Sequence, residues 1–355
     1  PYMAVVAYKC PNCGAPLEFS PESQKFECSF CGSSFSEEEL QKYEPAQSSE
    51  QTIVQEPAEE EGKEETAVLY TCPSCGAQIV TTETTAATSC LYCHSPVVLE
   101  GRLQGEFHPD RVIPFAFTRE EAERRFYEWV AKKRYVPKGY FDTGKTEYFM
   151  GVYYPYWVLD CDTSANYTAN ANRVRVWRDS RNEYTETSVY RIHRQGDLHF
   201  EDLTHCALDS EGRELADGVM PYRVLEAIPF KMPYLSGFRA EIRNLETDAL
   251  EPVFQDDIHK YTENLLRDTV TGYDSVYNSS LDSDVKRKDY QYALFPVWAF
   301  VYTGADQKKY YYSMNGQTGK VAGILPLDRK KLLRDAVLAG LGVAAVLLMI
   351  GGLLI

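Results

Sequence analysis

Two clusters of cysteines constrain this chain more than any other feature. Residues 10–31 read CPNCGAPLEFSPESQKFECSFC and residues 72–93 read CPSCGAQIVTTETTAATSCLYC, so each cluster has two Cys-x-x-Cys pairs separated by fourteen residues. Each pair directs two sulfurs at one point, and four thiolates at about 2.3 Å satisfy tetrahedral zinc. We therefore predict two structural zinc ions with no open coordination position. The predicted ligands are Cys10, Cys13, Cys28 and Cys31 for the first ion, and Cys72, Cys75, Cys90 and Cys93 for the second.

Disulfides, a redox motif and an iron site fit these cysteines less well than zinc does. Disulfides require an oxidising compartment. A redox Cys-x-x-Cys is expected singly, near a βαβ pattern. Rubredoxin-like iron uses similar knuckles, but the two halves of such a site lie much farther apart in sequence. His94 directly follows Cys93 and is an alternative ligand in the second cluster; we expect Cys93 to be the ligand.

The C-terminal twenty residues predict a membrane anchor. Residues 336–355 carry no charge and no strongly polar side chain, which is the length that crosses about 30 Å of hydrocarbon as a helix. A basic group, Arg329, Lys330, Lys331 and Arg334, precedes them and predicts that the N-terminal bulk faces the cytoplasm of a single-pass cell-membrane protein. A small-residue face at Ala336, Gly340 and Ala344 would allow homo-oligomerisation.

Composition divides the remaining chain into modules. The 355 residues have a net charge of −15, and we expect a first zinc ribbon at 1–42 and a second at 68–104. Between them, residues 43–67 are rich in Glu, Gln, Ser and Pro and predict an acidic disordered linker. The first ribbon should therefore be tethered and the second docked. Residues 328–355 form the predicted basic segment and membrane helix.

The segment 105–327 predicts a strand-rich α+β domain with an antiparallel sheet. A capping box at Thr118 and Glu121 opens one helix, and a second helical pattern presents Ile258, Tyr261, Leu265 and Leu266 on one face. The order Ile-Pro-Phe, helix, Pro-x-Trp strand occurs twice, which predicts an internal duplication with halves 105–222 and 223–327. Asn315-Gly316 predicts a hairpin turn.

Catalytic motifs are absent from the sequence. There is no H-E-x-x-H, no G-x-S-x-G and no dinucleotide-binding glycine pattern. One cluster stays open as a candidate enzymatic or metal site: a turn at 195–197 would bring His193 and His199 together across a hairpin, with His205 and Cys206 nearby. Ordinary surface histidines would produce the same pattern.

Charge argues against nucleic-acid binding by the ribbons. Residues 1–40 have two lysines against six glutamates, and residues 68–100 have no basic residue. Nucleic-acid affinity depends on Lys and Arg that neutralise phosphates. We therefore expect the ribbons to bind proteins.

Most of the chain resembles a known bacterial family. The two ribbons, the Val112-Ile113-Pro114-Phe115 segment, the strand 151–157 and the apolar C-terminus are similar to the membrane-anchored TFIIB-type zinc-ribbon proteins of Firmicutes, the YdjG-like family. All eight clustered cysteines match. The resemblance implies a membrane scaffold without enzymatic activity, acting in envelope stress with phage-shock-A-like or flotillin-like proteins.

The sequence thus predicts a non-enzymatic, membrane-anchored zinc scaffold that recruits or organises proteins at the cytoplasmic face. Two other classes stay open. One is a membrane-held nucleic-acid-binding regulator that uses its ribbons. The other is an enzyme with a site near His193, His199 and Cys206.

Overall fold

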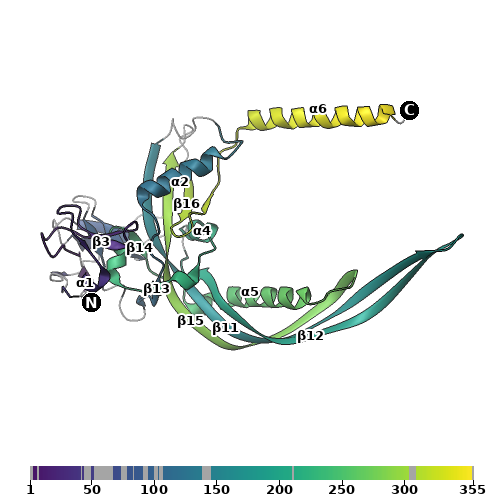
Figure 1. Ribbon diagram of the computed structural model, residues 1–355. Helices are drawn as coiled ribbons and strands as arrows, with labels where there is room; N and C mark the ends of the chain where they lie inside the picture. Colours follow the sequence, from purple (N-terminus) through teal and green to yellow (C-terminus); the bar gives the residue numbers. More distant parts are fainter. Residues whose placement is uncertain are drawn as a thin grey trace.

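A computed structural model gives the architecture (Figure 1). It describes residues 3–5, 8–40, 42–43, 49–51, 67–72, 78–82, 84–90, 95–99, 103, 107–137, 145–209, 212–303 and 309–353. Much of the predicted linker 43–67 lies outside these ranges.

The first ribbon is a three-stranded sheet followed by one helical turn. Strands β2 (Glu18–Ser20), β3 (Lys25–Glu27) and β4 (Ser34–Phe35) pair antiparallel, and α1 (Glu37–Leu40) follows. Leu17 is buried with Cys10 and Cys28 inside the ribbon, whereas Phe19 and Phe26 of β2 and β3 are buried in the core cluster shared with the main domain. We call residues 8–43 ribbon 1.

Two pairs of short strands come before the main sheet in the chain, and the second pair flanks Cys72 and Cys75 in sequence. β1 (Met3–Val5) pairs with β5 (Ser49–Gln51), and β6 (Ala67–Thr71) pairs with β7 (Gln78–Thr82).

Strands that follow β7 join the main sheet. β8 (Thr85–Ser89) pairs with β9 (Pro96–Val98) and also with β14 (Arg239–Glu241). β8 and β9, which lie within the range predicted for the second ribbon, therefore belong to the main sheet.

The main sheet contains ten strands and is mixed, whereas an antiparallel sheet was predicted. Its parallel pairs are β10 (Arg111–Val112) with β15 (Ser275–Thr303), and β14 with β11 (Lys145–Arg178). The remaining strands are β12 (Glu183–Cys206), β13 (Ile228–Pro229), β16 (Lys309–Asn315) and β17 (Val321–Gly323).

The pairings of β11 and β15 give the sheet a pseudo-twofold arrangement. Tyr153 pairs with Pro296 and Pro155 with Leu294, so the two Pro-x-Trp segments cross symmetrically. On the side away from β11, β15 pairs with β10 and with β16. On the side away from β15, β11 pairs with β14 and with β12. The strand that matches β10 is thus β14, whereas the sequence pattern had matched residues 228–230. The division at residue 222 stays a prediction.

The longer helices that pack on this sheet in the described part of the chain are α2 (Arg119–Ala131) and α5 (Thr247–Asp268). Thr118 caps α2 by accepting from the Glu121 N–H at 3.3 Å, which confirms the predicted capping box. On α5 the prediction is partly wrong. Ile258 and Leu266 are buried, but Tyr261 and Leu265 are 41% and 50% exposed. Short helices complete the domain: α4 (Gly212–Gly218), η3 (Val224–Glu226) and η4 (Met232–Leu235).

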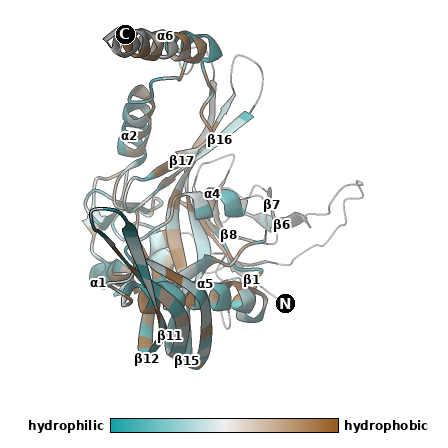
Figure 2. Cartoon of the chain, turned by 90° about the vertical axis from the view of Figure 1, so that its right-hand side faces the viewer, coloured by the Kyte–Doolittle hydropathy of each residue, from teal (hydrophilic) through white to brown (hydrophobic). Residues whose placement is uncertain are grey.

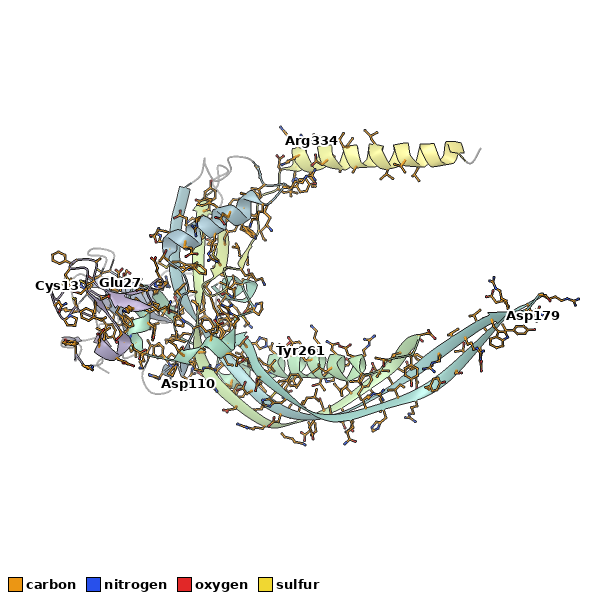
Figure 3. All side chains as sticks on the ribbon, viewed as in Figure 1. Cys13, Glu27, Asp110, Asp179, Tyr261 and Arg334 are labelled. Carbon is orange, nitrogen blue, oxygen red and sulfur yellow. The ribbon has the colours of Figure 1, made fainter. Side chains whose placement is uncertain are left out.

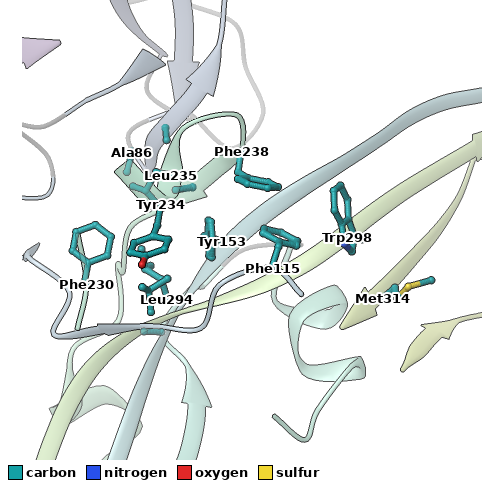
Figure 4. Packing of buried hydrophobic residues seen from close by; sticks show 14 of the residues in the cluster. Ala86, Phe115, Tyr153, Phe230, Tyr234, Leu235, Phe238, Leu294, Trp298 and Met314 are labelled. Atoms are coloured by element: carbon teal, nitrogen blue, oxygen red, sulfur yellow. The ribbon is translucent and has the colours of Figure 1, made fainter. Parts of the chain in front are cut away.

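The largest core cluster lies where ribbon 1, the main sheet, α2 and η4 meet. Phe115 stacks on Phe238 with ring centroids 4.3 Å apart, and Tyr153 and Trp298 pack edge-on or tilted against Phe115 (Figure 4). Gly151 is required there, because a Cβ would lie 2.5 Å from the Phe238 ring. The Asn315-Gly316 turn connects β16 and β17, as predicted.

Beyond the core, β11, β12 and β15 continue as a long curved arm with α5 lying along it (Figure 1). The side of the arm that α5 covers is apolar, with Ala165, Tyr167, Ala169 and Ile192 buried there together with Leu266 of α5.

The predicted membrane helix is contradicted. In the described part of the chain no helix is long and apolar enough to cross a membrane. α6 (Arg329–Leu353) begins with five charged residues in its first two turns. The predicted membrane partner and single-pass cell-membrane location are corrected accordingly.

The start of α6 contacts α2's C-terminal end. Arg134 forms an ion pair with Asp335 at 2.8 Å, and the Asp328 N–H donates to the Tyr135 carbonyl at 2.7 Å. Hydrophobic colours recur along the rest of α6 (Figure 2), where Leu338, Leu341 and Leu347 are each at least 60% exposed.

Candidate metal centre

The four cysteines of ribbon 1 converge on one point. Their Sγ atoms all lie within 4.8 Å of one another, and the Sγ atoms of Cys10 and Cys31 are 3.5 Å apart, as are those of Cys13 and Cys28. Four sulfurs at this separation surround a position that suits a tetrahedral ion with bonds of about 2.3 Å. The cluster could therefore hold a metal ion, and its all-thiolate donor set favours zinc.

Tight backbone turns place these sulfurs. The Gly14 N–H donates to the Cys10 carbonyl at 2.8 Å, and the Gly32 N–H donates to the Cys28 carbonyl at 2.9 Å. Gly14 and Gly32 have φ values of +76° and +71°, a conformation that glycine adopts without strain. The sequence C-x-x-C-G thus encodes each knuckle locally.

Hydrogen bonds distinguish the four thiols. The Ser33 hydroxyl, the Ser33 backbone N–H and the Cys13 thiol lower the pKa of Cys31 to about 6. At Cys13 the Ala15 backbone N–H opposes the shift, but desolvation and the neighbouring thiols raise its pKa to about 12. Four thiols this close do not all ionise alone, so a cation at their centre would stabilise the fully deprotonated set.

Ribbon 1 is docked on the main domain, although the sequence predicted a free tether. The Phe19 N–H donates to the Ser236 carbonyl at 3.1 Å, and the Ser236 hydroxyl donates to the Leu17 carbonyl. Tyr234 packs against Phe19 and Phe26 with centroids 5.1 and 5.7 Å apart, and its hydroxyl donates to Glu37 at 2.9 Å. η4 therefore holds the metal centre at one fixed place.

The second cluster is described only in part. Cys72 and Cys90 are buried with Tyr70, Val97 and Leu99. Cys75, Cys93 and the alternative ligand His94 lie outside the described residues. The Cys90 N–H donates to the Ser95 carbonyl at 3.0 Å, as the Cys28 N–H donates to the Ser33 carbonyl at 2.9 Å. This backbone hydrogen bond is the feature that the described residues of the two clusters share.

A cavity of about 610 Å³ lies where ribbon 1, β8, the start of α2 and β11 meet. Two arginines and two glutamates are among the residues that line it: Arg119, Arg239, Glu18 and Glu120. Arg239 already donates to Glu241 at 2.7 Å. These charges balance, so they select neither an anionic nor a cationic ligand.

The predicted histidine site is not assembled. No turn occurs at 195–197, because β12 runs unbroken to Cys206. His193 and His199 therefore lie six residues apart along one strand, roughly 20 Å. His199 contacts Asp162 at 2.6 Å, while His205 contacts Asp257 of α5 at 3.0 Å. Burial raises the pKa of the Cys206 thiol to about 12.

One surface residue was missed from the sequence. Phe30 lies between Cys28 and Cys31 and is 83% exposed, although large apolar side chains are usually covered. The sequence could have predicted this exposure, because Phe30 lies between the two cysteines of a metal knuckle, where side chains point away from the sulfurs.

Comparisons with known proteins define the family. No family model and no solved structure matches the chain. The curated protein described as "Uncharacterized protein YdjG" of Bacillus subtilis (strain 168) is 32% identical over 328 residues, which cover 92% of this chain and 92% of that protein. The TFIIB-type character of the ribbons stays a prediction. Identity at this level over nearly the full length shows that the chain belongs to the YdjG family.

Proposed function

We propose that this protein is a non-enzymatic scaffold that recruits other proteins through a zinc-stabilised ribbon. The observation that carries the proposal is Phe30, which is 83% exposed on the knuckle between Cys28 and Cys31. A bulky aromatic side chain held out by a rigid turn loses little conformational entropy on binding, and such residues often dominate the energy of protein interfaces.

Charge indicates the chemistry of the partner. Residues 8–43 contain six glutamates and three lysines, a formal charge of −3. Glu22, Glu27 and Glu38 are exposed. A partner with a basic rim around an apolar pocket would complement this surface. Phage-shock-A-like and flotillin-like proteins, which the sequence resemblance implies, are the first candidates to test.

Zinc in both clusters is part of the proposal. Small ribbons lack the apolar core that would fold them alone, so bound metal supplies that free energy. In the second cluster the proposed ligands are Cys72, Cys75, Cys90 and Cys93. The third cysteine of each cluster makes the same backbone hydrogen bond, Cys28 to Ser33 and Cys90 to Ser95, which supports a common geometry.

Affinity purification of the full-length protein tests the proposal, with quantitative mass spectrometry of what co-purifies. Three variants are compared with the wild type: Cys10→Ser/Cys13→Ser, Phe30→Ser, and the control Leu225→Ser. Leu225 is 81% exposed on η3, so it matches Phe30 in exposure but lies outside the ribbon.

The proposal expects a defined set of proteins with basic surfaces that the wild type and Leu225→Ser retain. Both ribbon variants should lose the same set, and Phe30→Ser should do so with its zinc content unchanged. Partners that stay on Phe30→Ser and on the cysteine variant alike would exclude ribbon 1 as the contact.

A further inference from the structure

The end of the arm is an exposed two-stranded hairpin. β15 begins at Ser275, opposite Asn172, so no strand pairs with β11 on that side beyond this point. Residues just before β15 still contact the next two residues of β11, since Arg173 donates to the Gly272 carbonyl and the Val174 N–H donates to Asp274. From there to the turn at 179–182 only β11 and β12 pair. We call residues 173–194 the arm tip. Its exposed apolar side chains are Val174, Val176, Trp177, Tyr184, Val189 and Tyr190.

The arm tip is basic, although the protein as a whole is acidic. It contains six arginines and three acidic residues, a formal charge of +3, while the chain carries −15. Asp179 accepts from the N–H groups of Arg181 and Asn182 at 2.8 Å and so is used within the turn. Glu183 is paired with Arg178. Glu186 lies opposite Arg175 in the register of β11 and β12. The arm tip therefore keeps a surplus of three positive charges, and Arg175, unlike Arg181 and Arg191, has an acidic residue across from it.

Aromatic rings form a platform among these arginines. Trp177 and Tyr184 stack across the two strands with centroids 5.6 Å apart and planes 14° from parallel. The Arg175 guanidinium lies 5.5 Å from the Trp177 ring centroid. Trp, Tyr and Arg are the residues most enriched at energetic hot spots of protein interfaces. Leaving this group exposed at the end of a long arm is typical of a contact surface.

Ribbon 1 has the complementary chemistry. Its formal charge is −3 against +3 for the arm tip, and both Phe30 and Glu27 are exposed on it. Figure 3 labels Cys13 and Glu27 at one end of the molecule and Asp179 at the other. The two surfaces of one chain therefore do not meet each other.

We propose that the arm tip of one copy binds ribbon 1 of a second copy. Arg175 and Arg181 would contact Glu22 and Glu27, and the Trp177–Tyr184 platform would cover Phe30. The inference rests on the proposed function, because it names this chain as one occupant of the Phe30 surface. Such a head-to-tail contact leaves one free tip and one free ribbon on the growing assembly, so copies add until the two free ends meet in a ring or continue as an open chain.

Sedimentation velocity of the purified full-length protein tests the proposal over a range of concentrations at about 0.05 M and about 0.5 M salt. Four proteins are compared with the wild type. The tip reversal is Arg175→Glu/Arg181→Glu, and the ribbon reversal is Glu22→Arg/Glu27→Arg. The third protein combines both reversals in one chain. Arg287→Glu is the control, since Arg287 is 67% exposed at the base of the arm.

The wild type and Arg287→Glu should associate with rising concentration, and more weakly at high salt. Each single reversal should weaken association at least about tenfold, because attraction at two pairs becomes repulsion. The combined reversal should restore it, which a merely damaged fold would not do. Unchanged zinc content confirms that each ribbon is intact.

Two results would overturn the inference. One is a wild type that stays monomeric at every concentration. The other is association that persists in both single reversals, as contact through the exposed apolar side chains of α6 would produce. Either result leaves the proposed function standing if Phe30→Ser still abolishes capture of other proteins.

Discussion

The buried hydroxyl of Ser236 donates a hydrogen bond to the backbone carbonyl of Leu17, and this bond joins η4 to ribbon 1. Ser236→Ala would leave the Leu17 carbonyl unpaired in the interior, at a cost of about 1–3 kcal/mol. We expect the free energy of unfolding to fall by that amount. Amide exchange at residues 17–19 should become faster, because docking of ribbon 1 is weakened.

Ser279→Ala is the matched control for this prediction. The Ser279 hydroxyl donates to Glu263 at 3.1 Å, but it does so on the surface. Its removal should change the free energy of unfolding by less than about 0.5 kcal/mol. Both free energies of unfolding are measured with denaturant. An equal decrease in the two variants would contradict a stabilising role for the buried hydrogen bond between Ser236 and Leu17.

A second prediction concerns the core glycine. A Cβ on Gly151 would lie 2.5 Å from the Phe238 ring and 2.8 Å from the Phe115 ring, so Gly151→Ala should destabilise the domain. Overpacking of this kind costs about 1–3 kcal/mol. Gly196→Ala on β12 has no atom within 4 Å of the new Cβ and should be close to neutral. Similar midpoints in urea for both variants would contradict the described packing of Phe115 and Phe238.

Zinc stoichiometry is the third prediction. Native mass spectrometry should find two zinc ions in the wild-type chain and one in each of Cys10→Ser and Cys72→Ser. Cys161→Ser should keep both ions, since Cys161 is a buried core residue on β11. Loss of zinc from ribbon 1 should also expose Tyr234, because the folded ribbon covers that ring. A wild type without zinc, or a Cys10→Ser chain that retains two ions, would contradict the metal assignment.

A fourth prediction follows from the histidine on the arm. The Asp162 carboxylate, 2.6 Å from His199, contributes most to raising the pKa of His199 above its ordinary value of 6.5, and Glu201 adds to the shift. Because the folded-state pKa is the higher one, this contribution to stability is fully present below about 6.5. It is lost as the pH rises through the folded-state pKa.

NMR titration measures this shift directly. The His199 midpoint should lie above 6.5, and Asp162→Asn should lower it more than Glu201→Gln does. A midpoint at or below 6.5 in the wild type, or a larger effect of Glu201→Gln, would be inconsistent with the described contact.

Local signals in the sequence predicted local structure well. The two Cys-x-x-Cys-Gly knuckles of ribbon 1, the Thr118 cap and the Asn315-Gly316 turn each depend on residues within a few positions, and the structure places them as expected. Pairings between strands far apart in the chain could not be predicted from such local signals. The match of β14 with β10 depends on register across the sheet, and strands of two and three residues are too short for a sequence pattern to reveal it.

The histidines and ribbon 1 show why contacts at long range were missed. The dipeptide Gln195-Gly196 suggested a turn, but pairing with β11 on one side holds β12 extended through it. Docking of ribbon 1 depends on η4, more than two hundred residues later in the chain. The prediction of a C-terminal membrane span relied on the apolar composition of residues 336–355, and it is contradicted because no helix in the described part of the chain is long and apolar enough to cross a membrane.

Site-specific photo-crosslinking at position 30 in living cells tests the central claim most directly. A photoreactive phenylalanine analogue replaces Phe30 in one strain and Leu225 in a second. The account predicts that position 30 crosslinks to one or more basic proteins, that position 225 does not, and that chelation of zinc abolishes the products. Absence of products at position 30, or the same products at both positions, would contradict recruitment through ribbon 1.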